Sequence, residues 1–302
     1  MLLNHGHPVD VLCVGASTYD LVYSVEHHPK PDEKIRATSF TGCGGGPAAN
    51  GAITVARLGL QSAFVGYLGH DIFGNAHLEE LQEAGVHTGL VARGEHSSAL
   101  SVVMVKPDGS RALVNYRKPE SFLAAGSVDC SNVRSKVILF DGHEPNISPP
   151  LARSARQRGI ITVLDAGSVH SGTEELAGMV DYLVCSEHFG LDFTGAATEA
   201  GALEALNAYA PNVIITLGQR GLVWKNRAGS GSLKAYKIKA VDTTGAGDVF
   251  HGALAACLAQ KKEWLASLRY ASAAGALCCT KIGARLGIPF REEVEDFLQR
   301  QG

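Results

Sequence analysis

The chain has 302 residues, enough for one large or two small domains with a substantial core. Hydrophobic residues make up 45% of it and charged residues 19%, a composition that excludes a mainly disordered chain. The 27 Lys and Arg residues against 30 Asp and Glu residues give a net charge of -3, so we expect neither nucleic acid nor an anionic membrane as a partner.

Short apolar strands alternate with helical segments along most of the sequence. Residues 9–15 form an apolar run that ends in glycine, a pattern typical of a buried strand. Over 47–58, small and apolar residues recur at helical spacing until Gly59 ends the helix. The alternation predicts an α/β fold with a mainly parallel sheet covered by helices. Further strands are expected over 62–66, 137–140, 160–165, 182–185 and 213–217.

Two segments, 32–41 and 97–116, interrupt this alternation. The second contains two β-rich runs around Asp108-Gly109, a dipeptide typical of a hairpin turn. Neither segment has a helix to cover it. We therefore expect both in a small antiparallel sheet that serves as a lid or as the contact surface of a homodimer.

The last third of the chain begins with a hairpin-like stretch over 221–238 and continues with helices expected over 246–260, 263–280 and 291–301. No internal repeat, low-complexity linker or charge block marks a boundary. We therefore expect residues 1–302 to form a single domain that includes the lid.

The most specific local pattern is VDTTGAGD at 241–248, where a strand-like segment passes through a glycine-rich turn into a helix. Gly245 and Gly247 allow backbone N–H groups to point into one concavity, and the helix N-terminus adds unpaired donors, so the turn is suited to bind a phosphate. Asp248 would repel that phosphate unless its task is to take a proton from an incoming hydroxyl. The alternative is that Asp248 merely caps the helix.

A second glycine cluster, GCGGGPAAN at 42–50, leads into the helix over 47–58. It does not fit the dinucleotide-binding pattern, because Pro47 replaces the last glycine, and the Walker pattern is also absent. What remains is a tight backbone turn that a ligand could approach closely. Asn50 at its end offers both a donor and an acceptor.

Together, these two segments resemble the signatures of the ribokinase-like (PfkB) carbohydrate kinase family. One signature is a Gly-Gly-rich turn that enters a helix ending A-R-L-G, and the other is D-T-x-G-A-G-D-x-F-x-G-A. The similarity extends through 216–221 and 273–289, so it covers essentially the whole chain. The resemblance implies a three-layer αβα sandwich as the fold. It also implies that the protein uses ATP and Mg²⁺.

The resemblance also implies roles for individual residues. Asp248 would be the base that deprotonates the sugar hydroxyl, and the amides of Gly245, Ala246 and Gly247 would form the anion hole. The sugar side would comprise Asp20, Gly45, Gly46 and Asn50, to which we add Asn115 of the lid and the strand-end carboxylates Asp141 and Glu144. The nucleotide side would comprise Thr216, Gly218 and Gly283, while Asp242 and Thr244 match positions where some members bind a monovalent cation such as K⁺.

One segment departs from the family pattern. Many members carry N-x-x-E, a motif associated with Mg²⁺ and phosphate, where residues 186–189 read SEHF here. Ser186 and Glu187 are candidates for the nucleotide side, with Mg²⁺ held through water, through the nucleotide or by Glu187. The alternative is that Ser186 simply caps a helix.

We predict an ATP-dependent sugar kinase that phosphorylates a hydroxymethyl group of a neutral ketohexose such as fructose. A kinase for a sulfonated sugar, ribose or a nucleoside is an alternative, and so is a non-catalytic sugar-binding regulator on the same fold. The seven cysteines include no C-x-x-C pattern, and we find neither a signal peptide nor eighteen consecutive apolar residues. These features predict a cytoplasmic protein with reduced core thiols.

Overall fold

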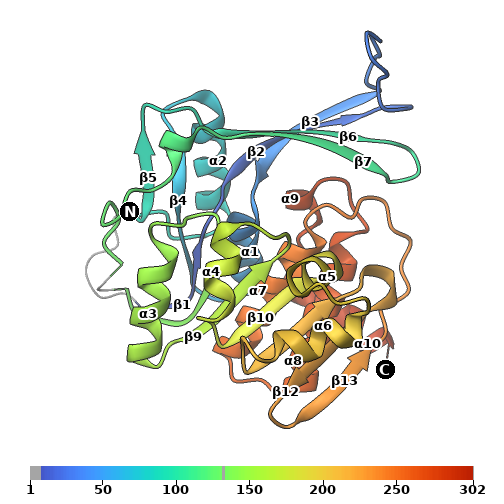
Figure 1. The fold of residues 1–302 in the computed structure, drawn as a ribbon. Coiled ribbons are helices and arrows are strands. Elements are labelled where there is room, and N and C mark those ends of the chain that lie inside the picture. Colours follow the sequence, from blue (N-terminus) through green and yellow to red (C-terminus); the bar gives the residue numbers. More distant parts are fainter. Residues whose placement is uncertain (1–7, 131–132, 302) are drawn as a thin grey trace.

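The computed structural model describes residues 8–130 and 133–301 (Figure 1). Within these residues the larger sheet has nine strands in the order β13-β12-β11-β10-β9-β8-β1-β4-β5. From β11 to β5 neighbouring strands are parallel, whereas β12 and β13 are antiparallel. The strands are β1 (Val9–Val14), β4 (Ser62–Gly69), β5 (Val91–Gly94), β8 (Ser135–Phe140), β9 (Ile161–Ala166), β10 (Tyr182–Ser186), β11 (Asn212–Thr216), β12 (Leu222–Asn226) and β13 (Gly229–Leu233).

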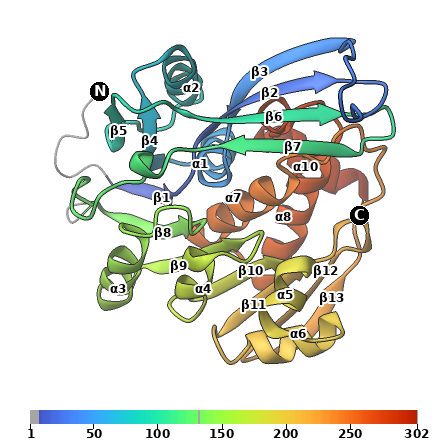
Figure 2. The same cartoon turned by 45° about the horizontal axis from the view of Figure 1, so that its top comes forward.

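Helices cover both faces of this sheet (Figures 1 and 2). Along β1, Val11 and Cys13 pack into one hydrophobic core, whereas Leu12 and Val14 pack into the other. The predicted three-layer αβα sandwich is therefore confirmed. The first core is covered by α1 (Pro47–Arg57), α7 (Ala246–Ala259), α8 (Trp264–Cys278) and α10 (Arg291–Gln301), and the second by α3 (Ser148–Arg158), α4 (Ser171–Ala177), α5 (Glu187–Thr194) and α6 (Glu199–Leu206).

A second sheet of four strands, among the residues described, forms the lid, in the order β3-β2-β6-β7. It extends beyond the large sheet in both views (Figures 1 and 2). Helix α2 (Ile72–Glu83) packs against β2 and β3, and the short helix α9 (Ala284–Gly287) lies against β3. The strands are β2 (Thr18–Ser24), β3 (Ser39–Gly45), β6 (Ala99–Val105) and β7 (Arg111–Tyr116).

The hairpin expected within 97–116 is confirmed by β6 and β7, but two details of the predicted lid are wrong. The first lid strand is not 32–41; β3 begins at Ser39 and continues through the glycine cluster to Gly45, because pairing with β2 holds these glycines extended. Strand β2 was not expected, and it pairs parallel with β6, so the lid sheet is mixed rather than wholly antiparallel.

Apolar side chains on the lid lie in solvent, as they would on a surface that meets another chain. Val114 and Tyr116 of the edge strand β7 are 62% and 49% exposed. Dimerisation through the lid stays a prediction. All seven cysteines are free thiols, six of them buried, which agrees with the expected core thiols. Across 8–130 and 133–301, no helix is long and apolar enough to cross a membrane.

Candidate active site

The glycine-rich turn before α7 forms an open cradle of backbone donors. Gly245, with φ of 78°, immediately precedes the helix in a left-handed conformation that glycine adopts without strain. The first helical hydrogen bond runs from Val249 N–H to Gly245 O at 2.9 Å. The N–H groups of Ala246, Gly247 and Asp248 therefore have no partner within the helix, and that of Ala246 donates weakly to Thr243 O at 3.4 Å. A Cβ atom at Gly247 would meet nothing within 4 Å, so the space beside the turn is free for an anion.

Asp248 stands beside this cradle in the first turn of α7. Asn50 of α1 donates a hydrogen bond from Nδ2 to Asp248 Oδ2 at 2.7 Å. Burial raises the pKa of Asp248, and the hydrogen bond from Asn50 opposes that shift. Since Gly245 occupies the cap position, Asp248 does not serve as the N-cap. Asn50 Oδ1 is buried and has no hydrogen-bond partner among the described residues.

Asp20 lies on lid strand β2 and is 7% exposed. Its Oδ1 accepts a hydrogen bond from Thr18 Oγ1 at 2.9 Å, and burial raises its pKa to about 6. A Cβ atom at Gly45 would lie 2.3 Å from Asp20 Oδ2, so this glycine leaves room for the carboxylate. Gly46, with φ of 94°, allows equally close packing, because a Cβ there would lie 2.5 Å from Ala16 O.

The lid register places Asn115 on the same face as Asp20. Directly paired residues in neighbouring strands project to one face of a sheet. One such row crosses the lid from β3 to β7 through Cys43, Asp20, Ser101 and Asn115. Ser101, which is buried, was missed in the sequence, although its place opposite Asn115 in the predicted hairpin could have indicated it.

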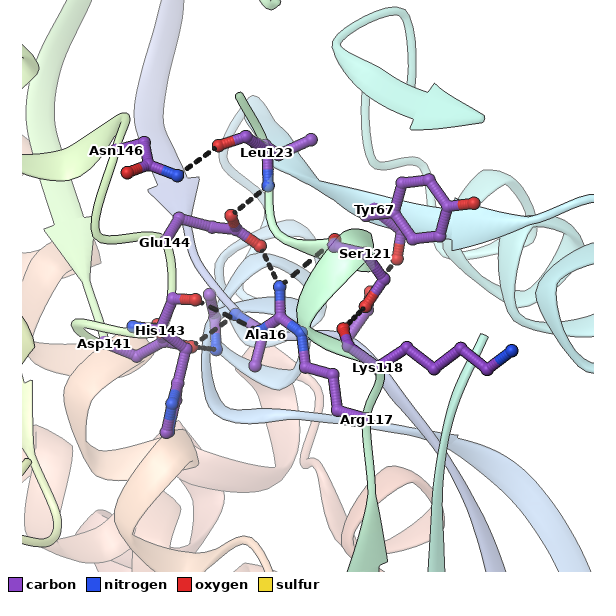
Figure 3. Close-up of polar contacts among 12 residues, drawn as sticks. Ala16, Tyr67, Arg117, Lys118, Ser121, Leu123, Asp141, His143, Glu144 and Asn146 are labelled. Carbon is purple, nitrogen blue, oxygen red and sulfur yellow. Dashed lines mark hydrogen bonds and ion pairs between the residues drawn. The ribbon is translucent and has the colours of Figure 1, made fainter. Parts of the chain in front are cut away.

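Asp141 binds the main chain on three sides (Figure 3). Its Oδ2 accepts hydrogen bonds from the N–H groups of Ala16 at 2.8 Å and Ala48 at 3.1 Å, while Oδ1 accepts from His143 N–H at 2.9 Å. These contacts fix the start of α1 and the loop after β1 at the end of β8. These contacts give Asp141 a structural role, and its sugar contact stays a prediction.

Glu144 also holds protein groups and not an open site (Figure 3). Its carboxylate pairs with Arg117 at 2.5 Å and accepts a hydrogen bond from Leu123 N–H at 2.8 Å. Burial raises the pKa of Glu144 to about 7, and Arg117 opposes the shift. Since Arg117 follows lid strand β7 and also donates to His143 O at 3.0 Å, the pair fastens the lid to the main sheet. These contacts give Glu144 a structural role, and its sugar contact stays a prediction.

On the predicted nucleotide side, Ser186 and Thr216 end two neighbouring parallel strands at paired positions. Ser186 caps α5 by accepting from Phe189 N–H at 3.0 Å, so its interpretation as a helix cap is confirmed. Glu187 is ion-paired with Arg220 at 2.5 Å. The ion pair engages Oε2 of Glu187, and the Ser186 hydroxyl also donates to Gly167 O at 2.8 Å. Contact of either residue with the nucleotide or Mg²⁺ stays a prediction.

Two glycines on this side lie beside open space. Gly218 and Gly283 have φ of 57° and 80°, and a Cβ atom at either position would meet nothing within 4 Å. With Gly247 they provide three places where a ligand can approach the backbone closely. The residues present therefore fit a bound nucleotide.

Asp242 connects the anion turn to the loop at Gly283. Its Oδ1 accepts from Thr244 N–H at 2.9 Å and from Thr244 Oγ1 at 2.7 Å, and its Oδ2 accepts from Gly283 N–H at 2.8 Å. Arg111 of the lid, absent from the predicted site, donates from Nη1 to Thr244 Oγ1 at 2.6 Å. With both carboxylate oxygens already accepting protein donors, a monovalent cation at Asp242 and Thr244 stays a prediction.

Two further buried residues, Asp165 and His251, contact each other near the glycine-rich turn and were not predicted from the sequence. Asp165 ends β9, and its Oδ2 lies 3.1 Å from Nδ1 of His251 in α7. A carboxylate at the end of an apolar strand was a usable signal for Asp165. His251 gave no such signal, because its contact with Asp165 joins segments far apart in the sequence.

Comparisons with known proteins agree with this geometry. The model of the pfkB family carbohydrate kinase matches residues 9–291. Ribokinase from Bacillus subtilis (strain 168) is 29% identical over 293 residues, which cover 96% of this chain and 99% of that protein. Fructokinase-1 from Zea mays is 30% identical over 295 residues, which cover 87% of this chain and 91% of that protein.

Solved structures show the same fold. Arabidopsis thaliana ribokinase complexed with ribose and ATP superposes with a TM-score of 0.85 at 25% identity, covering 97% of this chain and 99% of that one. Fructokinase with bound ATP from Xylella fastidiosa superposes with a TM-score of 0.80 at 26% identity, and the match covers 97% of this chain and 98% of that one. The family match spans nearly the entire chain, including both glycine-rich turns and Asp248. The chain therefore belongs to the pfkB family of carbohydrate kinases.

Proposed function

We propose that this kinase transfers the γ-phosphoryl group of ATP to a hydroxymethyl group of a small neutral sugar, with Asp248 as the base. The observation that carries the proposal is the position of Asp248 in the first turn of a helix whose backbone donors border open space. A carboxylate so close to an anion site is useful when it takes a proton from the attacking hydroxyl. The N–H groups before it stabilise the negative charge of the transferred group.

The nucleotide proposal depends on the glycines beside open space and on two relatives whose structures contain ATP. Mg²⁺ bound with the nucleotide would neutralise charge on the phosphates. Among residues 8–130 and 133–301, no group of three or more His, Cys, Asp or Glu side chains could hold a metal ion. We therefore propose that the nucleotide phosphates and water supply most of its ligands.

The sugar proposal depends on acceptor groups that need donors. Asn50 Oδ1 is buried without a partner, and Asp20 has an oxygen beyond the one that Thr18 occupies. Sugar hydroxyls can donate to both acceptors, and Ser101 and Asn115 share the face of Asp20. A site built in this way rejects molecules that lack these hydroxyls, because its buried acceptors would stay unpaired.

Three arginines near this side have protein partners, which favours a neutral sugar, and Nη1 of Arg285 is the one buried guanidinium nitrogen among them without a hydrogen-bond partner in the described part of the chain. Arg117 pairs with Glu144, and Arg111 donates to Thr244. Arg285, buried below β3, donates to Gly44 O and lies 3.8 Å from Glu80. A ketohexose such as fructose is our first candidate. Ribose is the second, because the ribokinase relative has nearly the same sequence identity to this chain as the fructokinase relative, 29% against 30%.

A panel of acceptors tests the proposal. ADP release is measured with fructose, ribose, a sulfonated fructose and a nucleoside, and sugar binding is measured by calorimetry on the same samples. We expect the highest kcat/KM with fructose, and ribose above the other two. A preference for the sulfonated sugar contradicts the neutral-sugar proposal, and binding without ADP release from any acceptor indicates a non-catalytic sugar-binding protein.

A further inference from the structure

Both ring nitrogens of His251 face hydrogen-bond acceptors. Nδ1 lies 2.5 Å from the carbonyl oxygen of Gly247, and Nε2 lies 3.1 Å from the carbonyl oxygen of Val184. Nδ1 also lies 3.1 Å from Asp165 Oδ2. His251 is 3% exposed, so its ring is shielded from solvent.

A carbonyl oxygen can only accept a hydrogen bond, and neutral imidazole carries one N–H group. With Asp165 ionised, either neutral tautomer would direct a nitrogen lone pair at an acceptor oxygen inside the protein, an unfavourable buried contact. The alternative is a neutral ring that accepts from a protonated Asp165, which would leave one lone-pair nitrogen in His251. We infer that His251 is a buried imidazolium with Asp165 as its counter-ion, and that it is a positioning residue for the anion turn and for Asp248.

The link to the anion turn is a single peptide unit. The carbonyl of Gly247 and the N–H of Asp248 belong to the same peptide, so the bond from His251 fixes the direction of that N–H. A hydrogen bond from a charged donor to the carbonyl also polarises the N–H at the other end of the peptide. His251 thereby prepares a phosphate donor without touching the phosphate.

The link to the base is electrostatic. Burial raises the pKa of Asp248, the Asn50 hydrogen bond lowers it, and the positive charge of His251 lowers it further. Other titratable groups that act on the pair or on Asp248 are Asp141 at the end of β8, Cys185 in β10 and Arg111 of the lid. The positive ring thus helps to keep a half-buried base ionised; this part rests on the proposed role of Asp248.

The charge of the ring can be measured without any assay. Nitrogen-15 NMR of the histidine rings in the intact protein near neutral pH distinguishes a protonated nitrogen from one with a lone pair. We expect two protonated nitrogens for His251, assigned by loss of its signals in H251N or, if that variant does not fold, by correlation with its own backbone. One lone-pair nitrogen in His251 overturns the inference.

His77 provides a control in the same spectrum. It is also buried, but its Nε2 lies 3.0 Å from Arg285 Nη2, a donor, so that nitrogen must accept. Burial and Arg285 lower the pKa of His77 well below its usual value. We expect a lone-pair signal from His77 beside two N–H signals from His251.

Kinetics then separate positioning from mere packing. In H251N the positive charge is lost, so the acidic limb of the plot of kcat/KM against pH should shift to higher pH by about one unit. At the same time kcat should fall about tenfold, with little change in KM for the sugar or for ATP. D165N removes the negative charge instead, so its acidic limb should not move up. An upward shift in both variants, or in neither, overturns the positioning role. Wild-type turnover by D248N would reject the proposed base and leave the NMR result unaffected.

Discussion

Arg111 at the start of lid strand β7 donates a hydrogen bond to Thr244, which immediately precedes the anion turn, at 2.6 Å. Thr244 donates in turn to Asp242, which accepts from Gly283 N–H. One chain of hydrogen bonds thus joins the lid, the turn before Asp248 and the loop on the nucleotide side. The position of the lid and the geometry of the glycine-rich turn are therefore connected through these hydrogen bonds.

The first prediction concerns this connection. R111Q should lower kcat/KM about tenfold, which corresponds to the free energy of one charge-assisted hydrogen bond. The reasons are that the turn loses a hydrogen-bond partner and that Asp248 loses a nearby positive charge. R111K should retain part of the activity. K106Q, on the same hairpin but paired with Asp108, is the matched control and should behave as wild type. Equal activity of R111Q and wild type would show that the lid contact is incidental.

The second prediction is that sugar affinity depends on the charge of Asp20. Burial raises the pKa of Asp20 to about 6, and its ionised form accepts hydrogen bonds from two hydroxyls. As pH falls through about 6 the carboxylate gains a proton, so KM for the sugar should rise, approaching tenfold for each further pH unit. D20N should raise KM and remove this dependence. A flat KM in the wild type over the same range would argue against sugar binding by Asp20.

The third prediction contrasts two neighbouring glycines. A Cβ atom at Gly247 would meet no atom of another segment within 4 Å, so G247V should fold normally and lose nearly all turnover because valine fills the phosphate cradle. G245V should instead impair folding, since its Cβ would lie 2.5 Å from Ala284 Cβ at a φ of 78°. Melting temperature and ADP release are measured for both. An active G247V would place the phosphate elsewhere.

The fourth prediction tests the structural role of Glu144. Above about pH 8 the carboxyl of Glu144, whose pKa is about 7, is ionised, and E144Q removes the charge that pairs with Arg117, so the free energy of unfolding at that pH should fall by about 2–3 kcal/mol. E120Q, at an exposed position nearby, is the control. Urea unfolding measures the loss, and KM for the sugar should stay close to wild type. A large rise in KM with unchanged stability would restore Glu144 to the sugar site.

The sequence was sufficient to predict most elements of the large sheet, because glycines such as Gly59 and Gly159 end helices directly before apolar strands. Strand β2 was missed because its seven residues carry no turn signal that separates them from the preceding loop. Its pairing with β6 joins residues such as Asp20 and Ser101, and no local pattern encodes such a contact.

The same limit applies to the residues of the candidate site. Asp248, Asn50 and Gly247 were predicted because motif and local chemistry agree. Asp141 and Glu144 were placed with the sugar because a carboxylate after a strand can serve either a ligand or the main chain, and only the partners decide.

Turnover of the D248N variant is the most direct test of the proposed mechanism. Asparagine keeps the shape of the side chain and can still contact Asn50, but it cannot accept the hydroxyl proton. With saturating ATP, Mg²⁺ and the best sugar of the panel, kcat should fall by roughly 10²–10⁴ while calorimetry shows nearly unchanged sugar affinity. Wild-type-like kcat in D248N would contradict the assignment of Asp248 as the base.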